Sequence, residues 1–290
     1  MTIKRWLSRN TSGLAGKRVA VTGATGGLGR QLCNYLAALG AELILLDRNA
    51  EKSALLQSEL KRKYPGIILS RIPLELENTG SVSAAAARLE ALLPDVLILN
   101  AGAYSIPRRK CETGFDNVFQ INFASHYCLV RRLLPVLRRN RARVVAVGSI
   151  AHRYSSTDPR DPDFSSRRSS ALVYGNSKRR LMFALEELFL NENEASLSIV
   201  HPGITFTDIT AHYPPWLFAI IKYPMKIIFM PPKRAALCLL KGAFEPCRGC
   251  EWIGPRFFDI WGLPAKRKLR SCSETERREI AAQAESLPPI

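Results

Sequence analysis

Short apolar runs alternate with helical patterns along most of the chain. Six runs have the character of strands that are buried on both faces: 19–21, 42–46, 66–72, 95–99, 143–147 and 196–200. Between them, apolar residues recur at helical spacing over 30–39, 50–63, 81–93 and 114–139. Strands that alternate with crossover helices predict an α/β fold with a doubly wound parallel sheet.

The chain is long enough to build one large domain around such a sheet. It has 290 residues, of which 47% are hydrophobic, and this supplies a full core. We expect a single domain over 17–265, preceded by a basic extension over 1–16 and followed by a polar, loosely packed tail over 266–290. A last strand is expected near 252–255.

The segment 205–232 is unusually rich in apolar and aromatic residues. It contains PPWLFAII at 214–221 and a second apolar run at 227–230. We expect it to form a lid over an apolar substrate, which Trp216, Leu217 and Phe218 would contact. Alternatively, the segment packs down on the domain itself, on a membrane interface or on another subunit.

The sequence TGATGGLG at 22–29 lies between the first strand and the first helix. A strand, a glycine-rich turn and a helix present backbone N–H groups and a positive helix end to an anion, typically a dinucleotide pyrophosphate. Gly23 can turn the chain, Gly27 can admit the phosphate, and Gly29 can let helix and strand pack closely. The turn predicts a Rossmann-type fold, although a βα turn with no ligand can look the same.

Two residues at the end of the second strand bear on the choice of dinucleotide. Asp47 lies about 20 residues past the glycine turn, where a carboxylate accepts hydrogen bonds from the adenosine ribose and repels a 2′-phosphate. Arg48 could instead bind that phosphate or stack on the adenine. We favour NAD over NADP, because a carboxylate at close range is harder to accommodate than an arginine is to redirect.

The candidate catalytic residues follow the fifth strand. Tyr174 and Lys178 are four residues apart, on one helical face. A nearby ammonium group would lower the pKa of the phenol from about 10, so that Tyr174 could exchange a proton with an alcohol or carbonyl during hydride transfer. Ser149 could hydrogen-bond the same substrate oxygen. A tyrosine and lysine at this spacing are common by chance, but the glycine turn and the serine make the set specific.

Taken together, these motifs resemble one family, the short-chain dehydrogenases/reductases. The matches, in the family's order, are TGATGGLG at 22–29, NAG at 100–102, Asn122, Ser149, Tyr174 with Lys178, and HPG at 201–203. The resemblance implies that Tyr174 donates or accepts the proton and that Lys178 holds the nicotinamide ribose. It further implies that Ser149 orients the substrate oxygen and that Asn122 supports a proton-relay water.

The resemblance also implies which residues bind the cofactor. They are Thr22, Gly23, Thr25, Gly26, Gly27, Leu28, Gly29, Asp47, Arg48, Glu75, Asn100, Ala101, Gly102, Tyr174, Lys178, Pro202, Gly203, Ile204 and Thr207. The phrases at 119–137 and 148–154 are similar to the retinol-dehydrogenase-like and WW-domain-oxidoreductase-like branch. That branch usually carries Cys-Arg after the second strand, so Asp47 puts its NADP preference in doubt, and its adenine-contacting Asp appears here as Glu75.

The formal net charge is +17, with Lys and Arg clustered at the N-terminus and at 138–143, 167–180 and 266–270. Such a field attracts nucleic acid, anionic membrane surfaces and anionic cofactors. No zinc-finger spacing or RNA-binding aromatic signature accompanies it, so we expect no nucleic-acid partner. Peripheral membrane contact stays open, because Trp6 and Leu7 lie among basic residues and the lid is apolar.

The seven cysteines are scattered, and we expect reduced thiols in a cytoplasmic protein that could lie peripherally on a membrane surface. Cys247 and Cys250 have the spacing of a metal or redox pair. No second pair or nearby histidine completes a metal site, so no metal is expected.

We therefore expect an NAD(P)-dependent oxidoreductase that interconverts an alcohol and a ketone or aldehyde. Its substrate would be hydrophobic, of a steroid-, retinoid- or lipid-like kind. The alternative is a catalytically silent dinucleotide sensor or scaffold with the same fold. The intact set of Ser149, Tyr174, Lys178 and Asn122 favours the enzyme, and a homodimer or homotetramer is compatible with either function.

Overall fold

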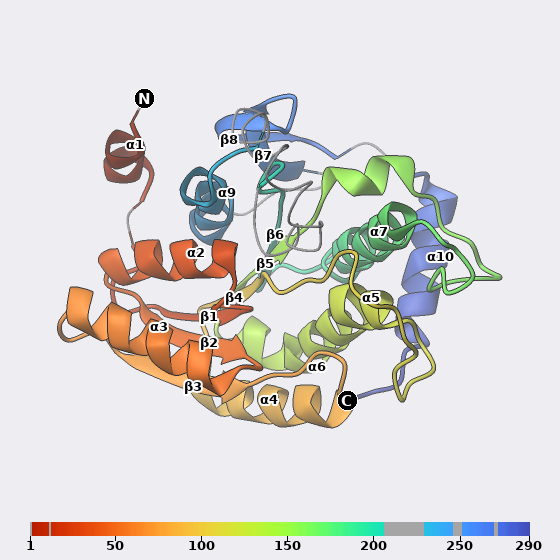
Figure 1. Cartoon of the computed structure of the whole chain (residues 1–290), viewed down its shortest axis with the longest axis horizontal. Coiled ribbons are helices and arrows are strands. Elements are labelled where there is room, and N and C mark those ends of the chain that lie inside the picture. The colour runs from red at the N-terminus through yellow and green to blue at the C-terminus, as the bar shows by residue number, and fades with distance from the viewer. Residues whose placement is uncertain (1, 12, 206–228, 246–250, 270–271) are drawn as a thin grey trace, which may run out of the picture.

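One mixed sheet runs through the molecule and is mostly parallel (Figure 1). The computed structural model describes residues 2–11, 13–205, 229–245, 251–269 and 272–290. Its strands lie in the order β3-β2-β1-β4-β5-β6-β7-β8, and only β8 is antiparallel to its neighbour. They are β1 (Arg18–Thr22), β2 (Glu42–Asp47), β3 (Leu69–Pro73), β4 (Val96–Leu99), β5 (Arg143–Val147), β6 (Ser196–Val200), β7 (Glu251–Phe257) and β8 (Trp261–Lys268). The predicted α/β fold with a doubly wound sheet is confirmed.

The strand order reverses between β1 and β4, which both pair in parallel with their neighbours. In sheets of this kind, ligands bind outside the carboxyl ends of the strands at the reversal point. The glycine turn after β1 and the NAG sequence after β4 both lie at this point. The fold therefore brings two separately predicted cofactor motifs to one crevice.

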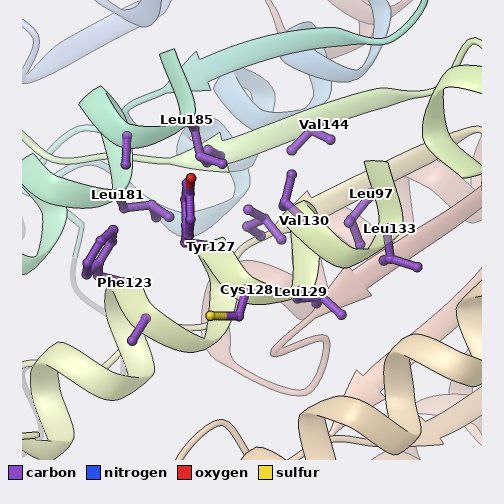
Figure 2. Close-up of a cluster of buried hydrophobic side chains, with 14 of the residues drawn as sticks. Leu97, Phe123, Tyr127, Cys128, Leu129, Val130, Leu133, Val144, Leu181 and Leu185 are labelled. Carbon is purple, nitrogen blue, oxygen red and sulfur yellow. The ribbon is translucent and has the colours of Figure 1, made fainter. Parts of the chain in front are cut away.

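Helices cover both faces of the sheet because its central strands, such as β1, β4 and β5, are apolar on both sides. One face carries α2 (Gly27–Ala38), α3 (Ala50–Lys63) and α9 (Pro232–Phe244), and its buried side chains form one core cluster. The other face carries α4 (Thr79–Leu92), α6 (Ser125–Arg139) and α7 (Ser170–Leu188). Figure 2 shows the second cluster, in which Tyr127 of α6 lies near Leu181 and Leu185 of α7, and Leu133 of α6 lies near Leu97 of β4.

The helix expected over 114–139 is interrupted. It begins as α5 (Asn117–Phe119), widens into a π-helical turn, η1 (Gln120–Ala124), and continues as α6 to Arg139. Asp116 caps its start by accepting a hydrogen bond from the Val118 N–H. A π turn inserts an extra residue into the helix and often marks a functional position. Here the insertion surrounds Asn122.

Both ends of the chain differ from expectation. The basic extension forms α1 (Ile3–Asn10), and Trp6 is only 3% exposed because it packs on the domain, so its indole is not free for a membrane surface. The tail expected to be loose contains the end of β8 and helix α10 (Glu274–Glu285). Ile280 and Ala284 of α10 are fully buried in the core beside α7 (Figure 1). Because the rest of this helix is mostly polar, the sequence did not indicate that these two residues are buried.

Several predicted features lie outside the described residues. They are most of the lid, with Trp216, Leu217 and Phe218, together with Thr207, Cys247 and Cys250. Among the described helices, none is both long and apolar enough to cross a membrane. The described part of the chain also contains no group of three or more His, Cys, Asp or Glu residues placed to hold a metal ion.

Candidate active site

The glycine turn is shaped by close backbone packing. Gly23 has φ +64°, and a Cβ there would lie 2.9 Å from the Cα of Ala101. A Cβ on Gly29 would collide with the Gly23 carbonyl oxygen. Gly26 precedes α2 without a side-chain cap, so the first amides of the helix point out of its N-terminus. These features fit a dinucleotide pyrophosphate, which needs donors and no side chains at that point.

Thr22 joins the glycine turn to the NAG loop. Its hydroxyl accepts a hydrogen bond from the Ala101 N–H at 2.9 Å, and the Asn100 side chain donates to the Thr22 and Gly23 carbonyls at 2.9 and 3.1 Å. His126 lies 3.3 Å from the same hydroxyl, and burial lowers the pKa of this histidine to about 3. A neutral imidazole therefore holds Thr22 in place. Thr25 and Leu28, also predicted to bind cofactor, are half-buried in the turn and first helix.

Asn122 anchors the loop that follows β4. Its Oδ1 accepts from the Ala103 N–H at 2.9 Å, and its Nδ2 donates to the Ala103 carbonyl at 2.8 Å and to the Ser177 hydroxyl at 3.1 Å. Both donors of the amide are thus used within the protein, and only acceptor capacity at Oδ1 is left for a water. A Cβ on Gly102 would lie 3.0 Å from that oxygen. The loop, the π turn and α7 are fixed to one another here.

Ser149 and Tyr174 come together as predicted. Ser149 caps the 3-10 turn η2 (Ile150–Tyr154) by accepting from the Ala151 N–H at 3.2 Å, and its side chain is close enough to Tyr174 to act on the pKa of the phenol. Gly175, next to Tyr174, allows the η2 backbone to approach, since a Cβ there would lie 2.7 Å from the Ala151 carbonyl oxygen. The close approach of η2 to α7 therefore brings the Ser149 turn against the turn of α7 that carries Tyr174.

The Tyr174 pKa differs from the predicted value. Burial raises it to about 12, and the charges of Tyr154 and Tyr104 act in the same direction, while the Ser149 hydrogen bond acts against them. The Lys178 ammonium lies 5.9 Å from the centre of the tyrosine ring and donates to the Val147 carbonyl at 2.9 Å. Burial lowers the Lys178 pKa to about 8. The predicted lowering of the Tyr174 pKa is wrong for this structure, because burial dominates the shift.

Asp47 lies at the predicted end of β2, but its side chain is nearly buried. Arg71 on β3 donates to its Oδ1 at 3.2 Å. Burial raises the Asp47 pKa, and the neighbouring Ser53 and Arg71 side chains act against this rise. Its Oδ2 is buried without a hydrogen bond of good geometry among the described residues. An oxygen of this kind fits a ribose hydroxyl, although Arg71 already balances part of the charge.

Arg48 and Glu75 face each other at the ends of β2 and β3. Their charged groups are 3.6 Å apart, and the Arg48 side chain is 68% exposed. Such an exposed pair is weak and easily exchanged for another partner. Both residues therefore lie at the carboxyl ends of neighbouring strands, and their role in binding adenosine stays a prediction.

The HPG sequence follows β6 at the opposite end of the crevice. Gly203 has φ +85°, and a Cβ there would lie 2.8 Å from the Ile260 carbonyl oxygen and 3.0 Å from Pro255. The Ile204 carbonyl accepts from the Met230 N–H at 2.8 Å. Pro202, Gly203 and Ile204 are thus held against the β7–β8 hairpin.

Several contacts escaped the sequence-based reasoning. Arg71, Tyr104 and Ser177 reach the site from segments where they form no motif. Tyr104 packs edge-to-face on Tyr174 with ring centres 5.2 Å apart. The only signal for Arg71 was a charged residue within an otherwise apolar strand, and a sequence does not show which strand lies beside which.

Comparison with known proteins agrees with this geometry. A family model described as short chain dehydrogenase matches residues 17–217. Mouse polyprenol dehydrogenase is 30% identical over 83% of this chain and 75% of its own length. Mouse retinol dehydrogenase 12 is 32% identical over 68% of this chain and 64% of its own length. The chain thus spans about two thirds to three quarters of these relatives.

Solved structures repeat the fold over most of the chain. An uncharacterized protein from Mycobacterium paratuberculosis has a TM-score of 0.69 and 26% identity, and covers 97% of this chain and 93% of its own. An NADP complex of RhlG from Pseudomonas aeruginosa has a TM-score of 0.61 and 26% identity, over 80% of this chain and 91% of its own.

Proposed function

The chain belongs to the retinol-dehydrogenase-like branch of the short-chain dehydrogenases/reductases, and we propose that its substrate is a long hydrophobic alcohol. As a member of this family, it is an NAD(P)-dependent oxidoreductase acting on CH–OH groups. The named activities of its relatives, on polyprenol and retinol, support this substrate class. The observation that carries the proposed reaction is that Ser149, Tyr174 and Lys178 lie together, with the Lys178 ammonium beside Gly102 of the NAG loop.

We propose that Tyr174 exchanges a proton with the substrate oxygen while Ser149 hydrogen-bonds that oxygen. The bound dinucleotide supplies the hydride chemistry. Lys178 stabilises the phenolate form by its positive charge, and this matters because burial alone holds the Tyr174 pKa at about 12. Asn122 keeps the 101–103 loop in place and leaves one acceptor position at Oδ1 for a water.

We further propose that the first turn of α2 holds the pyrophosphate and that Asp47 accepts the adenosine ribose. The buried Oδ2 of Asp47 supports NAD as the preferred dinucleotide. NADP would place a 2′-phosphate against this carboxylate, with Arg48 and Arg71 as the only cations described around it. The preference between NAD and NADP therefore depends on the Asp47 carboxylate, which favours NAD, and on Arg48 and Arg71, which favour NADP.

The test is the reduction of NAD or NADP, followed by absorbance, across primary and secondary alcohols of increasing length. We expect turnover with NAD to rise from short alcohols to retinoid- and polyprenol-like alcohols, because buried apolar surface adds binding energy of about 0.8 kcal/mol per methylene. Turnover of short polar alcohols alone would contradict the substrate class. Dinucleotide binding without turnover of any alcohol would favour the silent sensor.

A further inference from the structure

The C-terminal helix α10 is connected to the active site through one buried arginine. Arg179 follows Lys178 on α7, and its side chain is only 6% exposed. Its Nε and Nη2 donate to the two carboxylate oxygens of Glu276 on α10, at 2.6 and 2.5 Å. Its remaining Nη1 donates to the His152 carbonyl of η2 at 2.8 Å. One guanidinium therefore joins three elements.

Further contacts hold the Glu276 carboxylate in this position. The Thr157 hydroxyl donates to its Oε1 at 3.3 Å, and Ser273 caps α10 by accepting from the Glu276 N–H at 3.2 Å. Arg179 and the Thr157 and Cys272 side chains lower the Glu276 pKa against the effect of burial. The carboxylate is therefore ionised at neutral pH, and a bidentate, partly buried pair of this kind is far stronger than a surface ion pair.

The turn that Arg179 holds is the one that positions Ser149. Ser149 is the cap of η2, and the His152 ring lies 2.5 Å from the Ser149 carbonyl. Arg179 fixes the backbone of the same His152. The Ser149 hydroxyl is consequently held between two anchors. One is the close contact of Gly175 with the Ala151 carbonyl in the same turn, and the other is the link from His152 through Arg179 to Glu276.

We infer that Glu276 is a positioning residue for the reaction, acting through Arg179 and the His152 carbonyl on the orientation of Ser149. The inference rests on the proposed function for its kinetic consequence. Glu276 lies beyond the 17–217 segment that the family model matches, so family membership does not supply it. Helix α10 is then part of the catalytic unit and not a terminal appendage.

The matched comparison is between Glu276 and Glu274 on the same helix. Glu274 pairs with Arg278 at the surface, with both side chains at least 75% exposed. Glu276→Ala and the milder Glu276→Gln should lower kcat by roughly 10-fold or more, because small misplacements of a catalytic group are costly. Glu274→Ala should leave kcat unchanged. The dissociation constant of the dinucleotide should be unchanged in Glu274→Ala and should change far less than kcat in the two Glu276 variants, because Glu276 acts through η2 and not through the glycine turn.

A double-mutant cycle with Ser149→Ala separates positioning from general destabilisation. If Glu276 acts through Ser149, Glu276→Ala should cause little further loss of kcat in the Ser149→Ala background. Equal fold-losses in both backgrounds would overturn the inference.

Amide hydrogen exchange gives a readout that needs no turnover. Glu276→Ala and Glu276→Gln should speed exchange in 149–155, whereas Glu274→Ala should not. Unchanged exchange in this segment would overturn the inference even if activity fell. Faster exchange in a protein that oxidises no alcohol would uphold the structural link and refute the proposed function instead.

Discussion

The central residue of the site, Tyr174, has a phenol that is held protonated by its surroundings. Burial raises its pKa to about 12, while the nearby Lys178 has its own pKa lowered to about 8. Both shifts have the same physical cause, which is the cost of placing a charge away from water. A phenolate and an ammonium formed together would relieve this cost, so the two residues should act as a pair.

Tyr174→Phe should lower turnover by at least about 10²-fold, which is the usual size of lost general acid–base catalysis. The ring packing is kept, so dinucleotide binding should be normal. The matched control is Tyr104→Phe, which preserves the edge-to-face ring contact with Tyr174 and should keep near-normal turnover. Stopped-flow or steady-state rates with one long alcohol decide it, and normal turnover by the Tyr174→Phe enzyme would refute the assignment.

Asp47→Ala should weaken NAD binding and strengthen NADP binding. The change removes an acceptor for the ribose and a negative charge beside the 2′-phosphate position. Glu42→Ala, at the other end of the same strand, should change neither affinity, because Glu42 only pairs with Arg18. Dissociation constants of both dinucleotides give the answer. Tighter binding of NADP than NAD by the unaltered protein would show that Arg48 and Arg71 dominate.

At the scale of elements, the glycine turn and α2 depend on contacts that admit no side chain. Gly29→Ala would push a methyl group into the Gly23 carbonyl oxygen and within 3.0 Å of Ala24. Overpacking of this kind costs about 1–3 kcal/mol of unfolding free energy. We expect that loss in urea titrations, together with weaker dinucleotide binding.

The control for Gly29 is Gly80→Ala in the first turn of α4. There the nearest obstacle to a Cβ is a single side-chain oxygen at 3.2 Å. This variant should bind dinucleotide normally. Equal affinities for dinucleotide in both variants would mean that the turn does not hold the pyrophosphate.

The sequence was sufficient for those elements whose patterns are local. The apolar runs located the parallel strands β1 to β6, because each run is a signal of only a few residues. Ser149 and Tyr174 were each recognised from a short motif of their own, and the structure has the two side chains close together. The π turn around Asn122 was not predictable, since its sequence has ordinary helical periodicity. Helix α10 was missed because only Ile280 and Ala284 are buried along an otherwise polar stretch.

Contacts between elements could not be predicted from the sequence for a different reason. The ion pair of Arg71 with Asp47 requires β3 to lie beside β2, and the pair of Arg179 with Glu276 joins residues far apart in the chain. The tyrosine pKa was predicted with the wrong sign, because a sequence shows the neighbouring lysine but not the depth of burial.

For the molecule as a whole, three buried histidines make stability depend on pH. Burial lowers the pKa of His126 to about 3, of His152 to about 4 and of His201 to about 3. In the unfolded chain each would have the ordinary pKa of about 6.5. The unfolded state therefore binds more protons as the pH falls below 6.5, and the unfolding free energy must fall with it.

We expect the unfolding free energy to fall between pH 7 and pH 5 by up to about 2 kcal/mol for each of the three histidines. Urea titrations at the two pH values measure it. A His126→Gln variant should show a smaller decrease, because one of the three titrating groups is gone. An unfolding free energy that stays constant over this range would contradict the neutral, buried state of the histidines.

The proposed function requires that hydrogen passes from an alcohol carbon to the bound dinucleotide at the site formed by Ser149, Tyr174 and Lys178. The most direct measurement follows the label from a long-chain alcohol deuterated at its hydroxyl-bearing carbon. Mass spectrometry of the reduced dinucleotide should find one deuterium with the unaltered protein and at least about 10²-fold less product with Tyr174→Phe. Reduced dinucleotide without deuterium, or equal yields from the two proteins, would contradict the account.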